Sequence, residues 1–184
     1  MWIVIIILLF LFALIWLAYK HHYAIFILLL IAPYLCYQVT LYFWYAKFIP
    51  EQIEISYPVS VGEEFVLLRG GCAVAIYKVS DRTLDNIRQN GLKFFKQAVD
   101  ARAPIEHYNG SELKRYQAWS ATPLPPSWTS EGSWTMCDVA NSAVESEIIR
   151  ETKKAGAYYT VSTENETQLV LVPSLGYVMY SYYH

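Results

Sequence analysis

The sequence predicts a two-helix transmembrane hairpin followed by an α+β domain, and three observations support this fold class. Two long apolar runs fill residues 1–47. Of the 14 basic and 16 acidic residues, only Lys20 precedes Lys47. The remaining chain alternates strand-like runs with two helix-like patterns. This order predicts a mostly antiparallel sheet with two helices on one face and a long loop rich in Trp and Pro.

The apolar runs at 2–19 and 23–46 are each long enough to cross a bilayer. A helix rises about 1.5 Å per residue, so roughly 20 apolar residues cross the ~30 Å hydrocarbon core. A cleaved signal peptide would need a basic start and a small-residue cleavage site, which this N-terminus lacks. We therefore expect two spans, contact with the lipid bilayer, and an integral protein of a bacterial inner membrane.

The second run contains several residues that a lipid-facing helix does not need. Pro33 removes a backbone donor and predicts a kink, while Gln38 and Thr40 are expected to face another helix. Four aromatic residues, 42–45, crowd its C-terminal end, where amphipathic rings suit the headgroup layer.

The orientation prediction depends on very few charges. The short loop between the spans carries Lys20, and basic loops favour the cytoplasm, so the domain is predicted outside the cytoplasm. Lys47, after the second span, opposes this assignment.

Residues 48–52 read as an exit linker because Pro50 cannot continue a helix, and 53–184 as one globular α+β domain. Residues 53–57 alternate as a strand that Pro58 is expected to end. Apolar runs at 65–68 and 72–79 flank a Gly pair and predict a hairpin.

Two helices and a meander complete the predicted domain. Ser80 is a candidate N-cap for a helix with apolar residues spaced through Ala98, which Asn90-Gly91 can end early. A capping box at Ser142 begins a second helix. Apolar runs at 158–162, 169–172 and 177–183 then predict three antiparallel strands.

Residues 100–137 form an irregular middle that holds three indoles. Trp119, Trp128 and Trp134 either anchor a lid over the sheet or form a recognition surface for a partner. The 16 tyrosines also have two interpretations: they pack in a β-rich core, or they form an adhesive face.

The three cysteines have different interpretations. Cys36 lies inside the second span as a small apolar filler, whereas Cys72 and Cys137 can form a disulfide if the domain is exported. No Cys/His spacing indicates a zinc site, so no metal is predicted.

The sequence contains no motif that names a reaction. The candidate catalytic groups are Cys72, Glu106, His107 and Cys137, and nothing in the spacing brings them together. No cofactor motif is present, and a net charge of −2 without a basic face argues against nucleic acid as a partner.

The leading hypothesis is a membrane-anchored binding protein with a protein partner, acting in immunity, exclusion or envelope assembly. As architecture only, a two-span anchor with one compact domain resembles small bacterial membrane proteins that bind a toxin, a secretion component or a conjugation partner. The alternatives are a membrane-tethered enzyme with an unrecognised site, and a function carried by the transmembrane hairpin itself.

Overall fold

The computed structural model describes residues 2–19, 23–66, 70–107, 110–125 and 143–183. The chain divides into two compact units, Met1–Leu41 and Tyr42–His184. The residues predicted as a linker, 48–52, belong to the second unit together with the last turn of the preceding helix.

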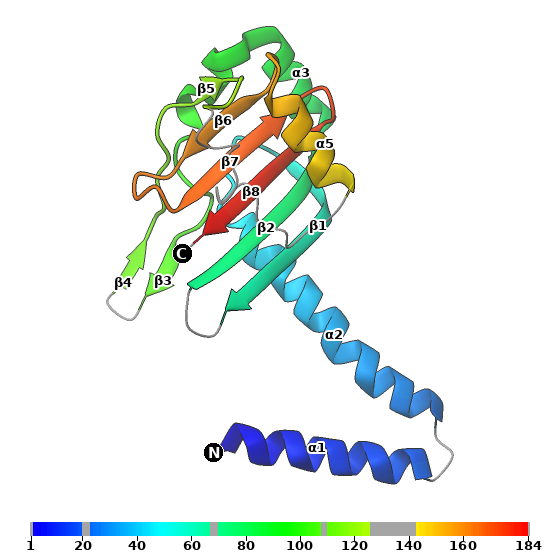
Figure 1. The fold of residues 1–184 in the computed structure, drawn as a ribbon. Helices are drawn as coiled ribbons and strands as arrows, with labels where there is room; N and C mark the ends of the chain where they lie inside the picture. The colour runs from blue at the N-terminus through cyan, green and yellow to red at the C-terminus, as the bar shows by residue number, and fades with distance from the viewer. Residues whose placement is uncertain (1, 20–22, 67–69, 108–109, 126–142, 184) are drawn as a thin grey trace. The chain divides into compact units, whose positions relative to one another are not determined.

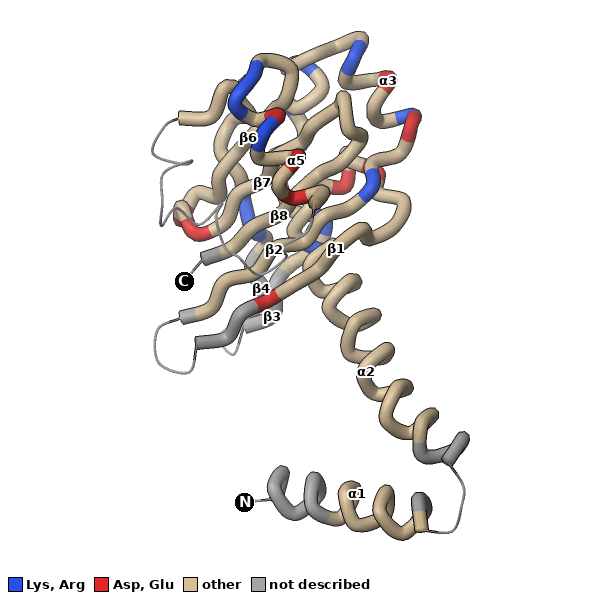
Figure 2. The backbone as a smooth tube through the Cα atoms, turned by 45° about the vertical axis from the view of Figure 1, so that its right-hand side comes forward, with Lys and Arg blue, Asp and Glu red and all other residues tan. Residues whose placement is uncertain are grey.

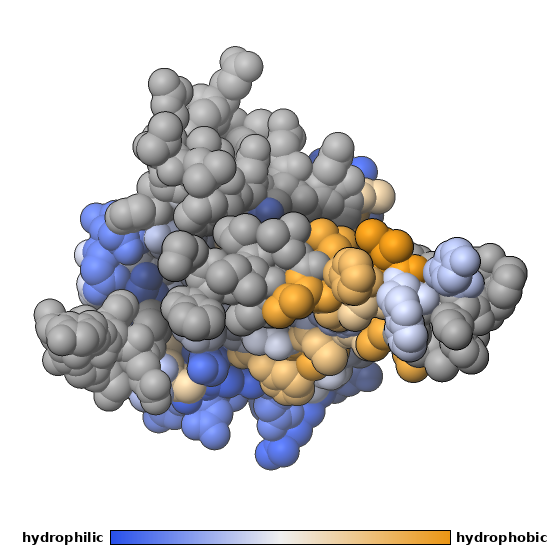
Figure 3. Space-filling view, turned by 90° about the horizontal axis from the view of Figure 1, so that it is seen from below, coloured by the Kyte–Doolittle hydropathy of each residue, from blue (hydrophilic) through white to orange (hydrophobic). Residues whose placement is uncertain are grey.

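The first unit consists of α1 (Trp2–Tyr19) and most of α2 (Tyr23–Ala46), whose bounds match the two apolar runs. Within the described residues, the stretch Ile27–Ala46 is long and apolar enough to cross a membrane. Figure 2 shows no charged residue along the described parts of either helix before Lys47, and their apolar side chains form orange patches in Figure 3. The other predicted span, which corresponds to α1, remains a prediction.

The second unit is built on a six-stranded antiparallel sheet with the order β1-β2-β8-β7-β6-β5 (Figure 1). The strands are β1 (Ile55–Val66), β2 (Gly70–Val79), β5 (Ser120–Ala121), β6 (Tyr158–Val161), β7 (Thr167–Val172) and β8 (Tyr177–Tyr183). The α+β class and the C-terminal meander are confirmed. Pairing of β2 with β8 joins the N-terminal hairpin to this meander.

Strand β1 does not end at Pro58, so this expectation was wrong. Pro58 pairs with Tyr77 within one twelve-residue strand. Two features accommodate the proline: β1 is an edge strand, and its register with β2 shifts between Pro58 and Ser60. A missing backbone donor is tolerated at such an edge or bulge.

Both faces of the sheet are covered, rather than one. Helix α5 (Ala143–Thr152) packs Ile148 against a cluster that includes Ile76, Val170 and Met179. The opposite face receives the 3₁₀ helix η1 (Gly91–Gln97), whose Phe95 lies 4.8 Å from Tyr158. The two helical segments therefore lie on opposite faces, because every residue of β7 is buried and both faces of this strand need a partner.

Helix α3 (Asp81–Asn90) begins as predicted, since the Ser80 hydroxyl accepts a hydrogen bond from the Thr83 amide at 3.2 Å. It ends at Gly91, which has a φ of +53°. A Cβ at Gly91 would lie 3.6 Å from the Tyr158 hydroxyl, an ordinary contact distance, so the positive φ rather than close packing favours glycine here. A separate two-stranded sheet pairs β3 (Ile105–His107) with β4 (Gly110–Glu112).

Candidate functional site

The end of α2 meets the sheet at a junction that combines ring contacts with hydrogen bonds. We call residues 42–53 and their contacts the α2 junction. Tyr42 lies 5.5 Å from Tyr77 of β2, measured between ring centroids. Tyr45 lies 5.6 Å from Tyr180 of β8, and Phe48 stacks on the same ring at 4.9 Å. Three aromatic side chains at three-residue spacing therefore contact two inner strands, β2 and β8.

Hydroxyl groups of two buried tyrosines bond carbonyl groups of this segment. The Tyr77 hydroxyl donates to the Tyr42 carbonyl at 3.0 Å, and the Tyr116 hydroxyl donates to the Phe48 carbonyl at 2.7 Å. Phe48 lies beyond the last residue of α2, so its carbonyl has no partner inside the helix, and a helical carbonyl such as that of Tyr42 can accept a second bond through its other lone pair. The end of α2 is thus bonded to the domain through its backbone as well as its rings.

Arg102 binds the segment that follows. Its Nε donates to the Ile49 carbonyl at 3.1 Å and its Nη2 to the Ile53 carbonyl at 3.0 Å. Both isoleucines are 0% exposed. The rigid fork of a guanidinium suits two acceptors held at a fixed spacing. Burial lowers the pKa of Arg102, and the nearby Glu51 carboxylate acts in the opposite direction.

The tyrosines beneath the junction are neutral packing groups. Burial raises the pKa of Tyr77, Tyr116 and Tyr180 above the ordinary value for a phenol. Desolvation penalises the charged phenolate, so each hydroxyl keeps its proton. These three tyrosines are therefore interior packing groups that contact the α2 junction.

Two residues of the same helical turn point away from the sheet. Phe43 is 62% and Trp44 45% exposed. The Lys47 ammonium lies 4.9 Å from the centroid of the Trp44 ring, a cation–π distance. Exposed aromatic and basic side chains of this kind are typical of the boundary between hydrocarbon and headgroups.

Of the three predicted recognition indoles, the structure describes Trp119. It is 7% exposed, its indole N–H donates to the Ala98 carbonyl at 2.7 Å, and its ring stacks on Phe95 at 4.4 Å. Trp119 thus anchors the chain against η1, as the lid interpretation expects. Trp128 and Trp134 lie outside the described residues.

The predicted catalytic residues fall in different elements. Cys72 lies in β2, opposite Tyr183 of β8, whereas Glu106 and His107 lie in β3 of the separate two-stranded sheet. Cys137 lies outside the described residues, so the Cys72–Cys137 disulfide and the catalytic hypothesis remain predictions. Among the residues that the structure describes, no group of three or more His, Cys, Asp or Glu side chains could hold a metal ion. Cys36 of α2 is a free thiol.

The α2 junction was not predicted from the sequence. The available signal was the apolar character of Phe48, Ile49 and Ile53, which is unusual for a linker and which the helix-ending Pro50 obscured. Arg102 carries no local signal at all, because its partners lie 49 and 53 positions earlier. In comparisons with known proteins, no family model, no curated protein and no solved structure matches the chain.

Proposed function

We propose that this chain is a membrane-anchored binding protein whose domain packs on the last turn of its apolar helix through the α2 junction. The observation that carries the proposal is the absence of a free linker between Ile27–Ala46 and the sheet in the described chain. Phe48, Ile49 and Ile53 are all buried, and Arg102 binds the carbonyls of two of them. The segment 47–54, between α2 and β1, therefore includes buried residues that are bonded to the domain.

A short connection has a consequence for binding. A domain on a long flexible tether samples many positions, and ordering it on a partner costs free energy. A domain that packs on the last turn of its own apolar helix has a short connection to the membrane, which limits this sampling and lowers that cost. This arrangement suits recognition of a protein partner in or next to the membrane, as in immunity, exclusion or envelope assembly.

The proposal includes two membrane spans in a bacterial inner membrane, with the domain outside the cytoplasm. It assigns the contact with the partner to the segment that contains Trp128 and Trp134. The burial of Trp119 removes that indole from the contact surface. Tyr77 and Tyr180 of the sheet are buried as well, and the Trp-bearing segment stays the contact that the sequence predicts.

A flexible insertion tests the short connection between the apolar helix and the domain. Four residues, Gly-Gly-Ser-Gly, are inserted between Lys47 and Phe48 of the full chain, and the same insertion between the exposed Glu164 and Asn165 serves as the control. Partners are cross-linked in intact cells, purified with each variant and compared with those of the wild type. We expect the junction insertion to stay in the membrane and lose the partner, while the control keeps both. Retention of the partner by both variants would contradict the proposal.

A second experiment tests the assigned contact. Trp128→Ala with Trp134→Ala should abolish cross-linking of the partner, because truncated indoles remove the apolar anchors that dominate many interfaces. Tyr57→Ala is the control, since Tyr57 is an aromatic residue on β1 that is 55% exposed. Undiminished capture by the double tryptophan variant would remove the segment from the proposal.

A further inference from the structure

Two polar side chains of the six-stranded sheet are buried without a hydrogen-bond partner. Gln168 of β7 and Ser181 of β8 are both 0% exposed. The amide oxygen and nitrogen of Gln168 and the hydroxyl of Ser181 make no hydrogen bond to any group of the chain. Buried polar atoms in folded proteins almost always have a partner, which is either a protein group or an ordered water. These three atoms therefore indicate a partner that the chain itself does not supply.

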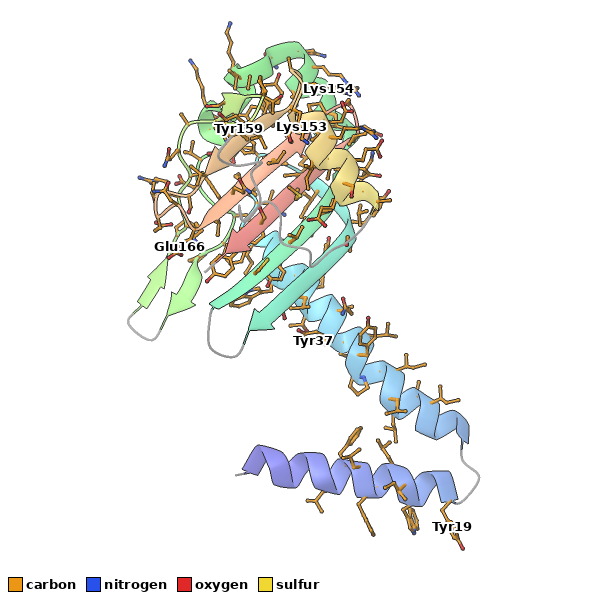
Figure 4. The ribbon with its side chains drawn as sticks, in the orientation of Figure 1. Tyr19, Tyr37, Lys153, Lys154, Tyr159 and Glu166 are labelled. Carbon is orange, nitrogen blue, oxygen red and sulfur yellow. The ribbon has the colours of Figure 1, made fainter. Side chains whose placement is uncertain are left out.

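The register of the sheet places the two side chains next to each other. Gln168 and Ser181 are directly opposite in the antiparallel pairing of β7 with β8. Figure 4 labels Glu166 at the turn that leads into β7, two residues before Gln168. Thr167, which also has an unpartnered buried hydroxyl, precedes Gln168 in the strand and so points to the other face. Because opposite residues share a face, with Cβ atoms about 4.5–5.5 Å apart, the polar atoms of Gln168 and Ser181 form one cluster.

The neighbouring strand positions are apolar. Val161 of β6 lies opposite Gln168 on its other side, and Val74 of β2 lies opposite Ser181. Val170, the next residue of β7 on this face, belongs to the apolar cluster on which α5 packs. Valine side chains neither donate nor accept hydrogen bonds, so these positions cannot satisfy the amide or the hydroxyl.

The hydrogen-bonding capacity of the cluster matches that of a small neutral molecule. The amide oxygen of Gln168 accepts, its nitrogen donates, and the Ser181 hydroxyl does either. A buried water typically makes about three hydrogen bonds, and the cluster offers three groups. Neither side chain carries a charge, and an ion buried without a counter-charge would be costly, so a neutral ligand fits this site better than an ion.

We propose that Gln168 and Ser181 bind one internal water molecule, which bridges β7 and β8 through their side chains. A bridging water explains why two adjacent polar side chains do not bond each other, since it spans a separation too long for a direct bond. The water thereby links two inner strands of the sheet beside the apolar cluster under α5. This site is distinct from the α2 junction, and it does not depend on the membrane anchor.

The sign of a stability change tests for the water. The full chain in detergent micelles is unfolded with urea and followed by tryptophan fluorescence. Ser181→Ala removes one bond to the water and should raise the unfolding equilibrium constant about fivefold, the effect of one hydrogen bond. Without a water, the same change would only remove an unpartnered buried hydroxyl, and the constant would stay the same or fall. Ser56→Ala, at an exposed position of β1, is the control and should stay within about twofold of the wild type.

A second variant tests whether both side chains bind the same molecule. Gln168→Met keeps the length of the side chain, removes the amide and should also raise the unfolding equilibrium constant. Combined with Ser181→Ala, it removes every proposed bond to the water at once. The effect of the double variant should therefore be smaller than the product of the two single effects. Single effects that simply multiply would contradict a shared water.

Nuclear magnetic resonance gives a direct readout that needs no variant. In the wild-type full chain in micelles, the side-chain amide protons of Gln168 should show a nuclear Overhauser effect with the water resonance, with the sign of a long-lived bound water. Absence of this effect, or unchanged or increased stability in both single variants, would overturn the proposal.

Discussion

The side chain of Arg102 offers the sharpest test of the α2 junction. Replacing it with Met keeps most of the apolar stem and removes the guanidinium that binds the carbonyls of Ile49 and Ile53 at 3.1 and 3.0 Å. The Ile49 carbonyl retains a bond from the Arg102 backbone amide at 3.3 Å, but the Ile53 carbonyl loses its donor. A buried acceptor without a partner costs about 1–3 kcal/mol. We therefore expect Arg102→Met to destabilise the junction by about 2 kcal/mol.

Proteolysis at Lys47 measures this change where it occurs. The bond after Lys47 enters the junction, since the next residue, Phe48, is 7% exposed and stacked on Tyr180. A lysine-specific protease should release fragment 48–184 from the full chain in detergent only when the junction opens. When opening is fast relative to cleavage, the rate follows the open population. A loss of about 2 kcal/mol corresponds to roughly thirtyfold faster release.

A matched arginine on the surface provides the control. Arg88 pairs with Asp85 at 2.8 Å, but both side chains are more than half exposed, so the pair contributes at most about 0.5 kcal/mol. Arg88→Met should leave release of the fragment within about twofold of the wild type. Equal release rates for the Arg102 and Arg88 variants would refute the assigned role of the guanidinium.

Two further predictions concern buried aromatic residues. Trp119→Phe removes the hydrogen bond to the Ala98 carbonyl and should lower the free energy of unfolding by about 1 kcal/mol, measured by urea denaturation. Trp119→Ala also removes the packing of the ring and should lower it by about 3–5 kcal/mol. Unchanged stability in both variants would contradict the role of Trp119 as an anchor. The stability of the domain should fall as the pH rises above about 10, because the buried tyrosines stay protonated in the folded chain and ionise in the unfolded chain. The expected slope is about 1.4 kcal/mol per pH unit for each buried tyrosine. Ultraviolet titration should show tyrosine ionisation delayed until unfolding, and simple ionisation near pH 10 of all tyrosines would contradict this. The tyrosines concerned are Tyr77, Tyr116 and Tyr180.

Features with local causes could be predicted from the sequence. The N-cap at Ser80 depends on a residue three positions away, and the structure has the expected bond. The C-terminal meander follows from apolar runs separated by short turns, and β6, β7 and β8 pair in that order. The break at Gly91 follows from its freedom to adopt a positive φ.

Features that depend on distant partners could not be predicted. From the sequence alone, Pro58 predicts the end of a strand. In the structure it lies in an edge strand next to a register shift, where a proline is tolerated. From the sequence alone, Arg102 is an ordinary solvated charge in a loop. The folded structure brings the carbonyls of Ile49 and Ile53 to its guanidinium. The position of η1 on the face opposite α5 likewise depends on β7 being buried on both sides.

The aromatic residues at the end of α2 show how the local sequence pattern and the contacts with distant strands combine. As a sequence, residues 42–45 form a single aromatic belt for the headgroup layer. A helix repeats every 3.6 residues, so Tyr42 and Tyr45 share one side and Phe43 and Trp44 face elsewhere. Tyr42 and Tyr45 pack on the sheet, while Phe43 and Trp44 are 62% and 45% exposed. One helical turn therefore holds the domain through one side, and in the proposed membrane anchor it contacts the headgroup layer through the other. In that proposed anchor, the division allows the chain to leave the bilayer and pack on the sheet within one helical turn.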